Sequence, residues 1–218
     1  MKRALKLVSI FLIIILTGVC IGGIFREAKD FVRQNIYVWT EKDPDKLPIY
    51  CVDTKEKVIS MTFDVAWGNE DMEEILRILK KEKVKATFFF SGEWISKYSE
   101  DVKKIYKEGH DVGNHGDHHK YMTKLSKEEQ RAEIRGAGDK AKSVLNMSID
   151  LFRPPYGDYN EEVIKTAEEM GYYSVQWSID SLDWMDLGTE NIIHKVCEHK
   201  ALEPGAIILM HTGTKYTK

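Results

Sequence analysis

Two histidines in the segment HGDHH, His115 and His119, stand four residues apart and could bind a metal ion together. Imidazoles at this spacing meet on one side of a helical turn, and neutral imidazole is a common ligand of Zn²⁺. The intervening His118 would point elsewhere, and Asp117 is better explained as a solvated loop acid than as a partner of a ligand. Because surface histidines also cluster by chance, the spacing favours a metal site without proving one.

Four other polar residues follow apolar runs rich in β-forming residues: Asp64, Arg153, Asp183 and His211. Arg153 precedes two prolines and could hold a carboxylate such as Asp64 in a bidentate pair. A neighbouring carboxylate raises the pKa of an imidazole, so His211 beside Asp183 would suit general acid catalysis near neutral pH. Together these residue types favour a catalytic site, but they do not identify the reaction.

From residue 49 the chain alternates short apolar runs with amphipathic helical patterns. Such alternation predicts an α/β fold of parallel strands covered by helices. In a parallel barrel the carboxyl ends of the strands share one rim, where active sites form. Five candidate residues lie at or just past expected strand ends: Asp64, His115, Arg153, Asp183 and His211. The segment SKEE also predicts a capping box. The expected strands are 58–63, 86–90, 111–114, 151–153, 172–178 and 206–211, and the expected helices are 69–84, 100–108, 127–145, 160–170 and 189–199.

Five segments in a fixed order, TFDVAWG, NHGDHH, RPPYG, DSLDW and LMH, resemble the motifs of polysaccharide deacetylases of carbohydrate esterase family four, the NodB-homology domain. They are spread over most of residues 58–211. The resemblance implies an irregular (β/α) barrel and a hydrolase that removes N-acetyl groups from amino sugars of a cell-wall glycan, with peptidoglycan as the expected substrate. The forms of the first and fourth motifs further resemble the membrane-anchored branch associated with sporulation in Gram-positive bacteria.

The resemblance assigns four catalytic roles. Asp64 matches the catalytic base, and Arg153 matches the arginine that holds this base. His211 matches the general acid that protonates the departing amine, and Asp183 matches the carboxylate that tunes this acid. Acetate and a free amino sugar would be the products.

The resemblance also implies a metal site and a substrate site. His115 and His119 match the histidines that bind a divalent metal ion, expected to be zinc, with cobalt, manganese or nickel as alternatives. Trp184 and Leu209 match an apolar patch around the acetyl methyl group, and Tyr156 belongs to the motif RPPYG, which lines the substrate.

One position departs from the family pattern. In most of the family a second aspartate follows the base directly and binds the metal, but Val65 occupies that position here. Asp64 could both bind the metal and act as base, Glu70 or Asp71 could reach back, or water could complete the coordination. The segment NED fits the start of a helix better than a ligand set. The remaining alternative is a glycan-binding or scaffold protein of the envelope with little or no catalytic activity.

The N-terminus carries an uncharged apolar stretch, residues 7–25, that is long enough to cross a bilayer as a helix. The basic residues Lys2, Arg3 and Lys6 precede it, so the positive-inside rule keeps the short tail in the cytoplasm. A cleaved signal peptide is the alternative, but the stretch has no clear Ala-x-Ala cleavage pattern. We therefore predict a single-pass cell-membrane protein with an extracytoplasmic catalytic domain. Its expected parts are a cytoplasmic tail 1–6, a transmembrane anchor 7–25, a stalk 26–48 and a deacetylase domain 49–218.

Composition narrows the choice of partners. The formal net charge is −3 and no block of basic residues occurs, so a nucleic-acid partner is not expected. We expect a monomer with one core, in which Cys51 and Cys197 are buried free thiols rather than a disulfide. The family normally continues through another helix and strand after the position of His211, so we expect a shortened barrel.

Overall fold

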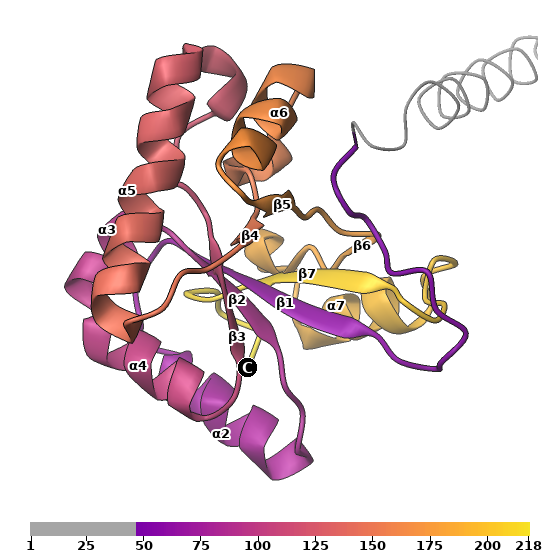
Figure 1. Ribbon diagram of the computed structural model, residues 1–218. Helices are drawn as coiled ribbons and strands as arrows, with labels where there is room; N and C mark the ends of the chain where they lie inside the picture. The colour runs from indigo at the N-terminus through magenta and orange to yellow at the C-terminus, as the bar shows by residue number, and fades with distance from the viewer. Residues whose placement is uncertain (1–46) are drawn as a thin grey trace, which may run out of the picture. The chain divides into compact units, whose positions relative to one another are not determined.

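A computed structural model describes residues 47–218 of the chain (Figure 1). The predicted tail 1–6, the predicted anchor 7–25 and nearly all of the predicted stalk lie outside the described residues. Among residues 47–218, no helix has both the length and the apolar character needed to cross a membrane.

A sheet of seven parallel strands lies at the centre of the described domain, in the order β5-β4-β3-β2-β1-β7-β6 (Figure 1). The strands are β1 (Ser60–Val65), β2 (Thr87–Phe90), β3 (Asp111–Asn114), β4 (Leu151–Phe152), β5 (Tyr173–Ser174), β6 (Ile179–Asp180) and β7 (Ile207–His211). Neighbouring strands are parallel throughout. The curled sheet and its covering helices agree with the α/β class and fit an irregular (β/α) barrel.

The segment that precedes β1 links the two sides of this sheet. Ile49 forms a parallel bridge with Val175, just after β5, and Cys51 forms an antiparallel bridge with Ala206, just before β7. The chain from 49 to 51 therefore pairs with strands from both halves of the strand order, which brings these halves toward closure.

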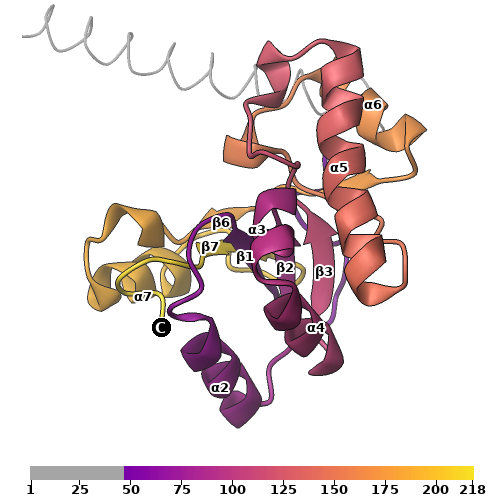
Figure 2. The same cartoon turned by 90° about the vertical axis from the view of Figure 1, so that its left-hand side faces the viewer.

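Helices cover the sheet between successive strands. They are α2 (Met72–Glu82), α3 (Gly92–Lys97), α4 (Ser99–Lys107), α5 (Lys127–Leu145), α6 (Glu161–Glu169) and α7 (Thr189–Cys197). The long helix α5 packs against α3, α4 and α6, and Figure 2 shows α5 and α6 side by side on one flank. Short 3₁₀ helices lie at Met122–Lys124, Pro155–Gly157 and Asp183–Met185.

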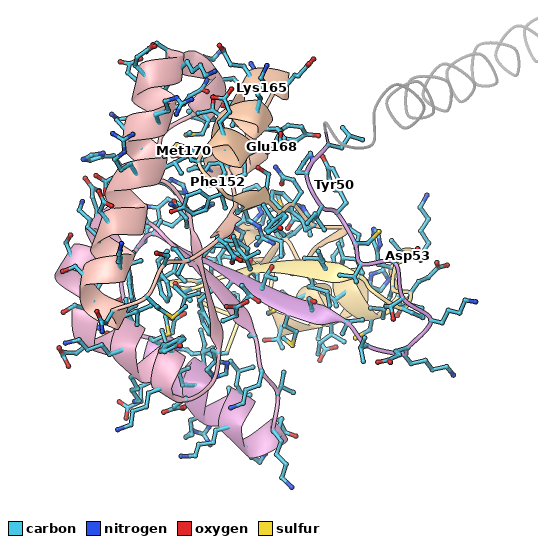
Figure 3. All side chains as sticks on the ribbon, in the orientation of Figure 1. Tyr50, Asp53, Phe152, Lys165, Glu168 and Met170 are labelled. Carbon is cyan, nitrogen blue, oxygen red and sulfur yellow. The ribbon has the colours of Figure 1, made fainter. Side chains whose placement is uncertain are left out.

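The amphipathic pattern of α6 explains how it covers β4. Phe152 at the end of β4 packs with Ala167 and Met170 in one apolar cluster. Lys165 and Glu168 on the opposite side of the helix are exposed to solvent (Figure 3). The 3.6-residue period of the sequence thus separates the buried face from the solvated face.

Alternation along β1 places consecutive residues on different faces of the sheet. Phe63 and Val65 are buried in the largest apolar cluster, together with Phe88 and Phe90 of β2. Thr62 and Asp64 instead point to the other face of the sheet, toward Arg153. Because successive side chains of a strand point to opposite faces, the apolar core and the polar site share this one strand.

One expected strand and the expected burial of two cysteines were wrong, and one helix was missed. The expected strand 172–178 is divided into β5 and β6, because the carbonyl groups of Val175 and Gln176 accept hydrogen bonds from the guanidinium of Arg153. Helix α3 was missed because it is too short to show a periodic pattern. Cys51 and Cys197 are free thiols as expected, but both are exposed rather than buried.

The capping box of α5 is confirmed and gives a first test. Ser126 Oγ accepts a hydrogen bond from the backbone N–H of Glu129, whose carboxylate accepts one from the Ser126 N–H at 2.8 Å. Ser126→Ala should lower the free energy of unfolding by about 1 kcal/mol in urea denaturation. Ser143→Ala, at an exposed position on the same helix, should cost nothing measurable, and equal losses in the two variants would contradict the role of the cap.

Candidate active site

The candidate residues meet at the carboxyl ends of the strands. Asp64 near the end of β1 is paired in register with His211 at the end of β7. His115 directly follows β3, Arg153 directly follows β4, and Asp183 lies shortly after β6. Side chains that are far apart in the sequence therefore lie along one edge of the sheet.

A buried ion pair joins Arg153 and Asp64. Arg153 Nη1 donates hydrogen bonds to Asp64 Oδ1 at 2.9 Å and to Thr62 Oγ1 at 2.8 Å. The remaining guanidinium nitrogens donate to the carbonyl oxygens of Val175 and Gln176 at 3.4 and 3.0 Å. The expected bidentate pair is therefore wrong, because two backbone carbonyls occupy the donors that a second contact would need.

The ion pair keeps Asp64 ionised in spite of burial. Burial raises the pKa of the Asp64 carboxyl, but interactions with His115, Arg153 and His211 outweigh it and lower the pKa below its usual value. Asp64 Oδ1 is bound by Arg153, and Asp64 Oδ2 lies 3.4 Å from His115 Nε2. One carboxylate oxygen is thus fixed, while the other faces the histidine pair.

The two histidines of HGDHH face each other through their Nε2 atoms, which are 3.2 Å apart. His115 Nδ1 donates to the carbonyl oxygen of Arg153 at 2.8 Å, which leaves His115 Nε2 as the nitrogen with a lone pair. Burial lowers the pKa of His115, and burial together with the neighbouring His115 ring lowers the pKa of His119 to about 3. Both rings are therefore neutral near neutral pH, which is the form that binds metals.

The geometry of this pair fits a divalent metal ion. Two nitrogens bound tetrahedrally to zinc at 2.0–2.1 Å stand about 3.3 Å apart, close to the separation of the two Nε2 atoms. Within residues 47–218, however, no group of three or more His, Cys, Asp or Glu side chains is arranged to hold an ion. The protein therefore offers two good nitrogen ligands and an incomplete set of further ligands.

Of the residues that could complete the site, Asp64 lies at the histidine pair, whereas Asp71 does not. Val65, at the position of the family's second aspartate, is fully buried in the apolar cluster. Asp71 does not reach back, because its Oδ2 accepts a hydrogen bond from the backbone N–H of Gly213 at 2.8 Å. Asp71 is the N-cap residue of α2, as expected for the segment NED, but its side chain makes no capping hydrogen bond.

On the other side of Asp64, His211 forms a tight pair with Asp183. His211 Nδ1 donates to Asp183 Oδ1 at 2.7 Å, and the His211 backbone N–H donates to Asp183 Oδ2 at 2.7 Å. Burial lowers the pKa of the imidazole, but the hydrogen bond to Asp183 and the charges of Asp64, Asp183 and Asp180 outweigh it and raise the pKa. With Nδ1 committed to Asp183, Nε2 carries the proton that His211 can transfer.

Exposed aromatic rings surround the histidine pair. The ring of Tyr156 meets His119 edge-on with a centroid separation of 4.5 Å and stacks on Tyr121 at 4.0 Å. Trp67 contacts the other side of His119 at 4.8 Å. Trp67 and Trp184, both more than half exposed, line an open hollow of about 240 Å³ next to His211.

The three predicted substrate residues differ in accessibility. Tyr156 and Trp184 present about half of their surface to solvent and can contact a bound ligand. Leu209 is only 3% exposed, so it supports the site from within β7 more than it offers a contact surface.

Two hydrogen-bonding residues of the site were missed in the sequence. Thr62 lies two positions before Asp64 on the same face of β1, a relation that strand alternation could have revealed. Thr217 donates to Asp183 Oδ2 at 2.6 Å, and no sequence pattern indicates this contact.

The family model described as polysaccharide deacetylase matches residues 52–175, which include Asp64, both metal-site histidines and Arg153. The match ends before Asp183 and His211, so this pair is supported by the geometry described above and not by the family model.

Several of the curated relatives are named as deacetylases. The chain is 32% identical to the peptidoglycan-N-acetylmuramic acid deacetylase PdaA of Bacillus subtilis, over 76% of this chain and 64% of that protein. It is 35% identical to a peptidoglycan-N-acetylglucosamine deacetylase of Bacillus cereus, over 79% of this chain and 81% of that protein. Against three curated relatives the chain spans about half to two thirds of their length, 51%, 63% and 64%.

A solved structure of a protein described as a pseudoenzyme of the same carbohydrate esterase family, from Bacillus anthracis, is also similar. Its TM-score is 0.72 at 35% identity, covering 76% of this chain and 58% of that chain. A mutant of a family pseudoenzyme described as having restored enzymatic activity matches with a TM-score of 0.72 and 36% identity. The same fold at this level of identity thus occurs with and without activity.

The His211–Asp183 pair gives a second test. Asp183→Asn should lower the pKa of the His211 imidazole, because the neutral amide no longer stabilises the imidazolium. The proton of His211 would then be lost at a lower pH than in the wild type, which an NMR titration of the ring measures directly. Asp180→Asn should lower the pKa less, since Asp180 contributes less to the shift. A wild-type pKa in Asp183→Asn would contradict this account.

Proposed function

Because this chain belongs to the polysaccharide deacetylase family, we propose that it removes N-acetyl groups from amino sugars of a cell-wall glycan, with peptidoglycan as the substrate. The names of the relatives support the class of substrate. The observation that carries the proposal is the pairing of Asp64 and His211 across β1 and β7, where the pKa of the carboxyl is lowered and the pKa of the imidazole is raised.

Two groups whose pKa values are shifted apart can serve as base and acid in one reaction. Asp64 is held as a carboxylate by Arg153, and its free Oδ2 can accept a proton from the attacking water. His211 is held as an imidazolium by Asp183, and its Nε2 can donate a proton to the leaving amine nitrogen. The water oxygen bonds to the acetyl carbon, the carbon–nitrogen bond breaks, and acetate and a free amine leave.

We propose that His115 and His119 hold a divalent metal ion, zinc or alternatively cobalt, manganese or nickel, with Asp64 Oδ2 as a further candidate ligand. When bound, such an ion lowers the pKa of water and polarises a carbonyl group. Arg153 contributes to both halves of the site, because its side chain holds Asp64 and its carbonyl oxygen orients His115. Tyr156 and Trp184 would line the sugar.

The proposal extends to the setting of the enzyme, which rests on the sequence alone. A membrane anchor at residues 7–25 would hold an extracytoplasmic, monomeric domain near the cell wall, and the motif forms favour a role in sporulation.

A second candidate function is a glycan-binding protein of the envelope with little or no activity. Val65 favours it, because a metal held by two histidines is bound weakly compared with a site of three protein ligands. The likeness to a family pseudoenzyme supports the same candidate. The two functions share the aromatic surface and differ in the chemistry at Asp64.

Acetate release separates the two candidates. The full chain, incubated with peptidoglycan or chitooligosaccharides and with zinc, should release acetate, and Asp64→Asn should reduce the rate at least a hundredfold because the base is lost. Glu70→Gln, in the loop that follows β1, should retain most of the rate. No acetate and no bound metal from a folded sample would overturn the enzyme proposal, while a loss of metal in Glu70→Gln would assign Glu70 to the metal site.

Val65→Asp tests whether an aspartate at this position would supply the ligand that the proposed metal site lacks. Without metal, a carboxylate at this buried position should lower the melting temperature, because an unpaired charge replaces an apolar side chain. If this position can supply the missing ligand, zinc should stabilise the variant more than the wild type, by about 1.4 kcal/mol for each tenfold gain in affinity. Val65→Asn serves as the control, because asparagine has nearly the same shape as aspartate and carries no charge. Equal zinc effects in all three proteins would show that this position does not reach the ion.

A further inference from the structure

We propose that Glu133 of α5 is a positioning residue that fixes His119 for metal binding. The inference rests on the proposed metal site of His115 and His119, and it adds a residue from a helix that contributes no other group to that site. Its basis is a set of contacts to the two neighbours of His119 in the chain.

The carboxylate of Glu133 binds the residue before His119 through two hydrogen bonds. The His118 backbone N–H donates to Glu133 Oε2 at 2.7 Å, and His118 Nδ1 donates to Glu133 Oε1 at 2.9 Å. The residue after His119 is bound as well, because Lys120 Nζ lies 3.1 Å from Glu133 Oε1. The side chain of Glu133 is only 4% exposed, so these partners replace the water that it loses on folding.

Between these two anchors, His119 adopts a strained backbone conformation. Its φ of 53° lies in the left-handed region, which residues with a side chain rarely adopt unless their surroundings hold them there. In this conformation its Nε2 comes within 3.2 Å of His115 Nε2. A relaxed backbone at His119 would turn the ring away from His115 and separate the two ligand nitrogens.

The start of the same turn is tied to α5 independently. Asn114 Nδ2 donates to the carbonyl oxygen of Ile134, and Asn114 Oδ1 accepts from the N–H of Gly116 at 2.9 Å. Asp117 forms an ion pair with Lys140, further along α5. The turn is therefore held without Glu133 up to residue 117, so loss of Glu133 should release the His118–Lys120 end and leave the fold intact.

The contacts of Glu133 reach the surface of the molecule. Its partners His118 and Lys120 are about half exposed, so changes at either residue do not disturb the core.

The test measures zinc affinity of the full chain by titration against a competing chelator. Glu133→Gln should weaken zinc binding at least tenfold, and His118→Ala, at an exposed side chain, should weaken it three- to tenfold. Glu128→Gln changes an exposed carboxylate on the same helix and should leave the affinity unchanged. In the metal-free protein, NMR contacts between the rings of His119 and Tyr156 should be lost in Glu133→Gln and kept in Glu128→Gln.

Each outcome decides the proposal. A folded Glu133→Gln variant with wild-type zinc affinity and intact ring contacts would overturn the role of Glu133 and leave the proposed function standing. If Glu133→Gln does not fold, His118→Ala decides in the same way. A wild-type protein that binds no zinc would overturn the metal site, and the role of Glu133 with it.

Discussion

The site depends on one buried charge, the guanidinium of Arg153, which is completely inaccessible to solvent. Removing such a group from water is costly unless every donor finds a partner, and here the partners are the carboxylate of Asp64, the hydroxyl of Thr62 and two backbone carbonyls. These partners come from β1 and from the segment after β5. The requirement to satisfy one cation therefore joins distant strands and sets the position of the carboxylate.

The need to pair each buried charge also explains why an acid and a base can lie a short distance apart. Arg153 neutralises Asp64 on one side, and Asp183 stabilises a positive His211 on the other. His115 and His119, on the other side of Asp64 from His211, are kept neutral by burial. The site therefore combines an ionised carboxylate, an imidazole with a raised pKa and two neutral imidazoles. Val65 lies outside this arrangement and would reduce only the number of ligands at the proposed metal site, so the acid and base pairs are present even though that site lacks a ligand.

Much of this could be predicted from the sequence, because periodicity and motif order survive in it. Helix α5, its capping box and the strand DVGN were predicted with their observed bounds, since each has a local signal. The divided strand at Val175 and the monodentate contact of Arg153 could not be predicted, because both follow from where a distant guanidinium finds acceptors. Glu133 was missed for the same reason: in the sequence it is one of several glutamates on an amphipathic helix, and its partners belong to another segment.

The register of β1 against β7 has a consequence for the order of events in folding. Asp64 and His211 are adjacent strand partners, yet they come from opposite ends of the described domain. Bringing together residues so distant in sequence costs conformational entropy, because the loop that they close is long. A growing chain has the base, both histidines and Arg153 before the final strand exists. The acid and the base therefore come together only when β7 pairs with β1. A chain that is incomplete before β7 contains Asp64 but lacks His211.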